Sequence, residues 1–261
     1  MKIEVAFNNN FNNVETYFGL KNYVCAVIDV IRATTTIATI LARGAKEILI
    51  AKSKTEAFYL KKIYKEHILC GEVGGHPPKG FDFGNSPLEF SKMELNGTGM
   101  ILKTTNGTKS FFKSSGSVAS FSLSLVNLGY VIDPIIKKAQ EKQSDILFIA
   151  SGEKGKTSYD DFYVAGQAIK YLLKKGLMIS LTDNAKIALS ASLREQNHME
   201  ALRKSISANT LITAGLSNDL DFCAKENLYD IAPLMEQRHF FEESGSRISG
   251  RKLFVLKAYR N

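Results

Sequence analysis

The chain has 261 residues, of which 44% are hydrophobic and 23% are charged, and its 34 basic and 26 acidic residues give a net charge of +8. This composition is typical of a globular protein and excludes the collagen-like, disordered and disulfide-scaffold classes. A chain of this length buries enough surface to need neither a disulfide nor a metal for its core. Three widely spaced cysteines without a Cys-x-x-Cys pair indicate a reducing compartment, and the first residues show no signal-type apolar stretch. We therefore expect a cytoplasmic protein that is not associated with a membrane.

The basic residues are spread along the chain and form no arm of consecutive charges. Pairs such as Lys61-Lys62 and Lys174-Lys175 lie in helix-like segments, where a solvated helix face explains them. Nucleic acid is therefore not expected as a partner, whereas a net positive charge suits the steering of an anionic small molecule.

Apolar runs alternate with helix-like periodicity along the chain. We predict strands at residues 1–5, 24–28, 47–50, near 70, 100–102, 146–149 and 253–256, and helices at 33–43, 53–65 and 158–175. This alternation predicts an α/β fold, a three-layer sandwich with a mixed, mainly parallel sheet and helices on both faces. No repeat or linker interrupts the pattern, so we expect a single domain over residues 1–261.

Four polar segments each follow a predicted strand: 29–36, 72–86, 104–108 and 151–161. The carboxyl ends of parallel strands lie along one edge of an open sheet, where ligands bind. The sequence therefore predicts that these four segments meet in one cleft. The second of them lies in a Gly- and Pro-rich loop that ends at Ser86-Pro87, a typical helix start.

Each segment allows a functional and a structural interpretation. Asp29 can bind a metal ion, and Arg32 with the three following threonines can bind an oxyanion, or these residues satisfy a turn and cap a helix. Glu72 is a metal ligand or a solvated loop carboxylate. The run 104–108, with Asn-Gly suited to positive φ, forms a nest of N–H groups around a phosphate or a tight turn.

The fourth segment fits a relaxed phosphate-binding loop pattern over residues 150–157, with Lys156 as its lysine. Against this interpretation, Asp160 and Asp161 fall in the first turn of the next helix and would repel a phosphate. Ser158 with Asp161 fits a helix cap followed by a metal ligand instead. The four histidines show no ligand spacing, so zinc is not expected.

Together these segments resemble the 2-phosphosulfolactate phosphatase family (ComB-like). The resemblance covers about residues 20–235 and rests on the ordered motifs Ile28-Asp29-Val30-Ile31-Arg32-Ala33-Thr34-Thr35-Thr36, Gly71-Glu72-Val73-Gly74-Gly75, Gly80-Phe81-Asp82-Phe83-Gly84-Asn85-Ser86-Pro87 and Thr104-Thr105-Asn106-Gly107-Thr108. Asp160-Asp161 and Asp221-Phe222-Cys223-Ala224 resemble its later motifs. Two positions depart from the family, because Ala150 stands where Cys is frequent and Asp160 where Glu is usual.

The resemblance implies a Mg²⁺-dependent phosphatase that hydrolyses (R)-2-phospho-3-sulfolactate, or a related 2-phospho-acid, to 3-sulfolactate and phosphate, a step of coenzyme M biosynthesis. Because Mg²⁺ prefers a few carboxylates and water, we expect Asp29, Glu72 and Asp161 as metal ligands. We expect Asp29, Arg32 and Asp161 as catalytic residues. The expected substrate-binding residues are Thr34, Thr35, Asn85, Ser86, Thr104, Thr105, Asn106, Gly107 and Thr108.

Two other functions stay open from the sequence. One is a nucleotide hydrolase that uses residues 150–157, and the other is a non-catalytic binder of anionic metabolites. The oligomeric state also stays open, a homo-oligomer included, as does whether Asp29 attacks phosphorus or only binds the metal.

Overall fold

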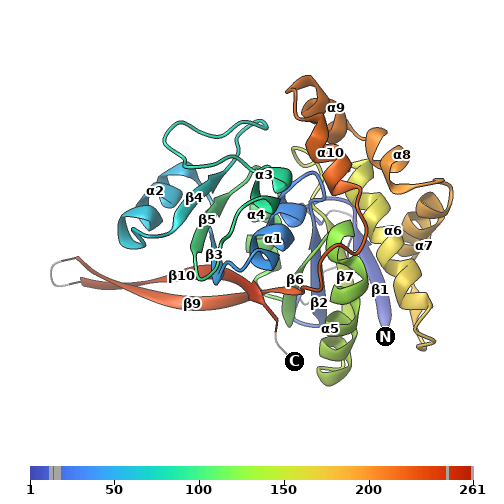
Figure 1. Ribbon diagram of the computed structural model, residues 1–261. Coiled ribbons are helices and arrows are strands. Elements are labelled where there is room, and N and C mark those ends of the chain that lie inside the picture. The colour runs from blue at the N-terminus through green and yellow to red at the C-terminus, as the bar shows by residue number, and fades with distance from the viewer. Residues whose placement is uncertain (12–13, 15–18, 245–246, 260–261) are drawn as a thin grey trace.

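The computed structural model describes residues 1–11, 14, 19–244 and 247–259 (Figure 1). Within these residues the strands form a single sheet with the order β4-β5-β3-β10-β9-β6-β2-β7-β1-β8. The strands are β1 (Lys2–Ala6), β2 (Tyr23–Ile28), β3 (Glu47–Ile50), β4 (Ile68–Gly71), β5 (Gly99–Lys103), β6 (Ala119–Leu123), β7 (Asp145–Ala150), β8 (Ser180–Leu181), β9 (Pro233–Ser244) and β10 (Arg247–Ala258).

The sheet contains two parallel groups. Strands β4, β5 and β3 form one group, and β6, β2, β7, β1 and β8 form the other. The antiparallel hairpin β9–β10 joins them, with β10 paired to β3 and β9 paired to β6 through Phe121 and Leu234. The predicted mixed, mainly parallel sheet is therefore confirmed, although the sequence predicted only residues 253–256 of this hairpin.

Helices cover both faces of the sheet, as predicted for a three-layer sandwich (Figure 1). They are α1 (Ala33–Ala42), α2 (Lys54–Ile63), α3 (Pro87–Ser91), α4 (Gly107–Ser114), the 3-10 turn η1 (Leu125–Asn127), α5 (Leu128–Glu141), α6 (Tyr159–Leu173), α7 (Asp183–Leu193), α8 (His198–Arg203), α9 (Ile206–Thr213) and α10 (Ser217–Cys223). The three predicted helices end within two residues of α1, α2 and α6. Among the described residues no helix has both the length and the apolar character needed to span a bilayer.

Alternate residues of the central strand β2 enter two different cores, which is why its sequence is apolar throughout. Val24 and Ala26 pack with α5 and α6 on one face. Cys25 and Val27 pack on the other face with residues of α1 and α4, and the same core includes buried residues of β3, β4 and β5. Helices α1 and α4 are thus shared by both parallel groups, as Figure 1 shows. This shared layer brings the carboxyl ends of the two groups to the same region.

Candidate active site

The four polar segments meet in one cavity of about 430 Å³ at the ends of β2, β4, β5 and β7, which confirms the predicted cleft. Its lining consists of Asp29, Ile31, Arg32, Glu72, Val73, Gly74, Gly75, Asn85, Thr104, Thr105, Asn106, Glu153, Lys154, Ser207, Thr210, Leu211 and Ala214. Three of these side chains are carboxylates, namely Asp29, Glu72 and Glu153, and two are cations, namely Arg32 and Lys154.

Asp29 follows β2 directly and is buried to 7% exposure. Burial and the nearby charge of Glu72 raise the pKa of its carboxyl to about 8, although the N–H groups of Ala33 and Gly107 oppose the rise. The Ala33 N–H donates to Asp29 Oδ1 at 3.3 Å. A carboxyl in this state holds a proton near neutral pH unless a cation replaces it.

Asp161 and Asp160 lie in the first turn of α6 and are both buried. Asp161 accepts the Val30 N–H at 2.8 Å on one oxygen and the Gly152 N–H at 3.0 Å on the other. Burial, together with the charges of Asp160 and Asp29, raises the pKa of Asp161 well above its usual range. Asp161 does not line the cavity, and its bonds tie the end of β2 to the end of β7.

Burial raises the pKa of Asp160 to about 6, and a short hydrogen bond from the Ser158 hydroxyl opposes this rise. Ser158 occupies the N-cap position of α6, as predicted, but its side chain makes no capping hydrogen bond to the helix. Its hydroxyl instead contacts Asp160 and lies 3.0 Å from the Ser207 Oγ of α9. Ser207 lines the cavity, and the acidic pair therefore connects to the cavity through a hydroxyl.

Glu72 follows β4 and lies between two segments of the cavity wall. Its Oε1 accepts the Thr105 N–H at 2.6 Å and its Oε2 accepts the Gly75 N–H at 2.9 Å. The predicted positive φ at Asn106-Gly107 is wrong, because these residues begin α4 in right-handed geometry. Gly107 is required there for space, since a Cβ would lie 2.7 Å from the Ala33 Cβ and 2.9 Å from Asp29 Oδ2.

The structure places the other predicted substrate-binding residues in two groups. Asn85, Thr104, Thr105 and Asn106 line the cavity. Within the described part of the chain, the buried Asn85 Oδ1 and Thr105 Oγ1 atoms have no hydrogen-bond partner. Buried polar atoms without a partner are costly, so these two atoms indicate a polar ligand in the cavity. Outside the lining lie Thr34, Thr35, Ser86, Gly107 and Thr108.

The threonines outside the lining have structural hydrogen bonds. Thr34 Oγ1 accepts the Asp29 N–H at 3.1 Å, and the Thr35 hydroxyl donates to the Val30 carbonyl at 2.8 Å. The Thr108 hydroxyl donates to the Thr104 carbonyl at 2.8 Å. These side chains shape the cavity wall, and their polar groups are directed at the backbone.

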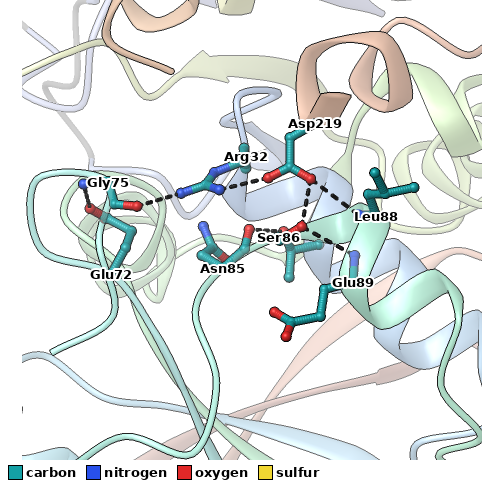
Figure 2. Close-up of polar contacts among 9 residues, drawn as sticks. Arg32, Glu72, Gly75, Asn85, Ser86, Leu88, Glu89 and Asp219 are labelled. Carbon is teal, nitrogen blue, oxygen red and sulfur yellow. Dashed lines mark hydrogen bonds and ion pairs between the residues drawn. The ribbon is translucent and has the colours of Figure 1, made fainter. Parts of the chain in front are cut away.

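Arg32 lines the cavity and is 5% exposed. Figure 2 shows its polar contacts. Its Nη1 donates to Asp219 Oδ2 at 2.7 Å, and its Nη2 donates to the Gly75 carbonyl at 2.9 Å. The Ile31–Arg32 peptide bond is cis. Ser86, which was expected to bind substrate, donates its hydroxyl to Asp219 Oδ1 at 2.5 Å and caps α3 by accepting the Glu89 N–H.

The segment 152–157 forms a tight turn and not a phosphate-binding loop. The N–H groups of Glu153 and Lys156 each donate to the carbonyl of the other, at 2.9 and 3.0 Å. The Lys154 N–H donates to Asn106 Oδ1, while Asn106 Nδ2 donates to Glu153 Oε2 at 2.8 Å. The N–H groups of Glu153, Lys154 and Lys156 are therefore already bonded within the protein, and Lys156 is exposed outside the cavity lining.

Sequence reasoning missed several residues of the site. The sequence places Glu153 and Lys154 only within a nucleotide-binding pattern, yet both line the cavity. The α9 wall, which includes Ser207 and Leu211, lies in a region where no helix was predicted. Asp219 was also missed, although it lies two residues before the noted motif that begins at Asp221. The polar start of that helix was the only signal for it.

The donor set fits a divalent cation in part. Asp29 and Glu72 line the same cavity, and the charge of Glu72 raises the pKa of Asp29, so the two carboxylates lack a compensating cation between them. Mg²⁺ usually takes one or two protein carboxylates together with water and substrate oxygens. Among the described residues, however, no group of three His, Cys, Asp or Glu side chains is placed to hold a metal ion. Asp161, the expected third ligand, lies outside the cavity lining, and its two oxygens accept backbone N–H groups, as those of Glu72 also do.

Fold and site together define an α/β protein with a cavity at the carboxyl ends of its parallel strands, lined by three carboxyl side chains, an arginine and a lysine. The chain belongs to the 2-phosphosulpholactate phosphatase family of phosphoric monoester hydrolases, whose sequence profile matches residues 11–238. It is 38% identical over 248 residues, 94% of this chain and 98% of the relative, to a probable 2-phosphosulfolactate phosphatase of Carboxydothermus hydrogenoformans. Proteins of the same name from Thermotoga maritima and Deinococcus radiodurans are 37% and 35% identical, over 80% and 81% of this chain and 87% of each relative.

Proposed function

We propose that this chain is a Mg²⁺-dependent phosphatase that hydrolyses (R)-2-phospho-3-sulfolactate, or a closely related 2-phospho-acid, to the 2-hydroxy acid and phosphate. The observation that carries the proposal is the cavity itself, which brings Asp29, Glu72 and Arg32 together at the strand ends. The names of the relatives supply the substrate class.

Asp29 and Glu72 would hold the cation. A bound Mg²⁺ would neutralise charge on the phosphoester and orient it for attack by water. Asp161 would act indirectly. Its carboxylate accepts the N–H groups of Val30 and Gly152 and so fixes the backbone next to Asp29.

Arg32 would bind the phosphoryl oxygens. Its guanidinium has five N–H groups, and the part of the chain that the structure describes provides partners only at Nη1 and Nη2. The remaining N–H groups are available to a ligand in the cavity. The Asn85 carboxamide and the Thr105 hydroxyl would add polar contacts, since each has a buried atom that lacks a partner in the described residues.

Phosphate release from 2-phosphosulfolactate and 2-phospholactate, measured with Mg²⁺ and with EDTA, tests the proposal. We expect turnover with Mg²⁺, loss of turnover in EDTA, and recovery when Mg²⁺ is added back in excess. ATP serves as the comparison substrate for a nucleotide hydrolase. Equal turnover in the chelated, metal-free protein would contradict the metal requirement, and a folded protein that releases no phosphate from any 2-phospho-acid would contradict the proposed function.

A further inference from the structure

Asp219 is a buried acid that supports the site from outside the cavity. It lies in α10, is 2% exposed and does not belong to the cavity lining. Its Oδ2 accepts a hydrogen bond from Arg32 Nη1, and its Oδ1 accepts hydrogen bonds from the Ser86 hydroxyl at 2.5 Å and the Leu88 N–H at 3.3 Å (Figure 2). One carboxylate thus connects α10, the start of α1 and the start of α3.

Arg32 has a second set of acidic groups close by. The Gly75 carbonyl oxygen accepts a hydrogen bond from Arg32 Nη2, and the Gly75 N–H donates to Glu72 Oε2 (Figure 2). The guanidinium and the Glu72 carboxylate are therefore bonded to the same residue. Asp29 lies three positions before Arg32 and lines the same cavity. A guanidinium readily forms strong charge-assisted hydrogen bonds to any carboxylate within reach. Glu72 and Asp29 are therefore the candidate partners of Arg32 if the charge of Asp219 is removed.

In the structure Arg32 forms its ion pair with Asp219. The Arg32–Asp219 pair is buried on both sides, with side-chain exposures of 4% and 3%. Further hydrogen bonds from Ser86 and Leu88 fix the position of the Asp219 carboxylate, so that the pair has a defined geometry. Paired in this way, Arg32 does not neutralise Asp29 or Glu72, although the Lys103 ammonium lies near Glu72 and donates to its backbone carbonyl at 3.2 Å.

We propose that Asp219 is a positioning residue that keeps Arg32 from pairing with Asp29 and Glu72, so that these carboxylates, which accept only backbone N–H groups among the described residues, can also bind a divalent cation. Without the Asp219 charge, Arg32 takes the place of the cation and lowers the affinity of the site for Mg²⁺. This inference rests on the proposed function, in which Asp29 and Glu72 hold Mg²⁺.

Calorimetric titration of the whole protein with Mg²⁺ alone tests the inference without any activity measurement. Asp219→Asn keeps the shape and the hydrogen-bond acceptor but removes the charge, and we expect its affinity for Mg²⁺ to fall at least tenfold. Arg32→Met combined with Asp219→Asn removes the competing cation as well, and we expect an affinity within threefold of the wild type. Asp221→Asn, at an exposed position of the same helix, is the matched control and should titrate like the wild type.

Three outcomes would overturn the inference. Asp219→Asn with wild-type affinity would show that Asp219 does not protect the carboxylates. A double variant as weak as Asp219→Asn would assign the loss to a damaged fold, which circular dichroism would record. A wild-type protein that binds no Mg²⁺ would also overturn it, whereas phosphate release with and without EDTA judges the proposed function separately.

Discussion

At the scale of single residues, Asp29 combines burial with the nearby charge of a second carboxylate, Glu72. Its carboxyl is buried beside Glu72, and its pKa is raised to about 8, whereas an exposed aspartate has a pKa of about 3.9. A structural strand-end residue would not need a charge in such a position. Groups with strongly shifted pKa values in a cavity are frequent in catalytic sites. This position suits the role that we propose for Asp29, that of a ligand to the cation.

Asp29→Asn is the direct test of this role. The substitution preserves the shape but removes the charge, and we expect turnover at saturating Mg²⁺ to fall at least about a hundredfold, or about 2.7 kcal/mol of transition-state stabilisation. Steady-state phosphate release measures the effect, with Asp221→Asn as a control at an exposed position. A folded and fully active Asp29→Asn protein would make Asp29 a structural residue.

The sequence predicted residues of this site well where a polar group directly follows a strand. Asp29, Glu72 and Thr104 are of this kind, because the end of a buried strand fixes where the next side chain lies. The sequence could not predict which polar side chains form hydrogen bonds within the protein and are therefore not directed at a ligand. Thr34 and Thr35 looked like anion ligands, but their hydroxyls bond the backbone around Asp29, and only the three-dimensional path of the turn decides this.

At the scale of elements, the turn after β7 shows why a short motif can mislead. Residues 150–157 follow a strand and precede a helix, as a phosphate-binding loop does, but Glu153 and Lys156 pair with each other across Lys154 and Gly155. Both central residues have positive φ, at 52° and 80°. The turn presents Glu153 and Lys154 to the cavity and Lys156 to solvent.

The two lysines of this turn form a matched pair for mutation. We expect Lys156→Ala to leave kcat/KM within about tenfold of the wild type, a difference of less than about 1.4 kcal/mol. Lys154→Ala should raise KM more, because Lys154 lines the cavity and can contribute charge to the binding of an anionic substrate. Steady-state kinetics of the two variants, compared side by side, measure this order. Collapse of activity in Lys156→Ala alone, with the fold intact, would favour a nucleotide-binding loop after all.

At the scale of the whole molecule, the sequence predicted a mixed, mainly parallel sheet but neither its division into two parallel groups nor the hairpin that joins them. Strands with continuous apolar runs, such as β2 and β7, are visible from sequence because both faces are buried. In β9 the residues from 236 to 239 are exposed or half-buried, so no alternation marks the strand. The hairpin β9–β10 exists because β3 and β6 offer it partners, and such long-range pairing leaves little local signal.

The burial of several acids also affects the stability of the whole molecule. Burial raises the pKa of Asp29 to about 8 and of Asp160 to about 6, and it raises the pKa of Asp161 as well. In the unfolded chain these groups titrate near pH 4. Between about pH 4 and pH 8 the folded protein therefore binds more protons than the unfolded chain, and the free energy of unfolding decreases as the pH rises. His67 acts in the opposite direction near pH 6, because burial lowers its pKa.

We therefore expect the metal-free protein to lose thermal stability between pH 5 and pH 8 through these aspartates, and Asp29→Asn to remove part of the loss. The difference in Tm between Asp29→Asn and the wild type isolates the Asp29 contribution, because the His67 effect is common to both proteins and cancels. This difference should grow in favour of the variant as the pH rises towards about 8 and then level off, since Asp29 is ionised above that pH. Mg²⁺ should raise the Tm of the wild type more at pH 8 than at pH 5, because protons compete with the cation for the carboxylates. It should have little effect on the Tm of Asp29→Asn. Calorimetric scans with and without Mg²⁺ measure the pH dependence of the Tm difference and the Mg²⁺ effect. A Tm difference that does not change with pH would show that Asp29 is ionised in the folded protein across the whole range.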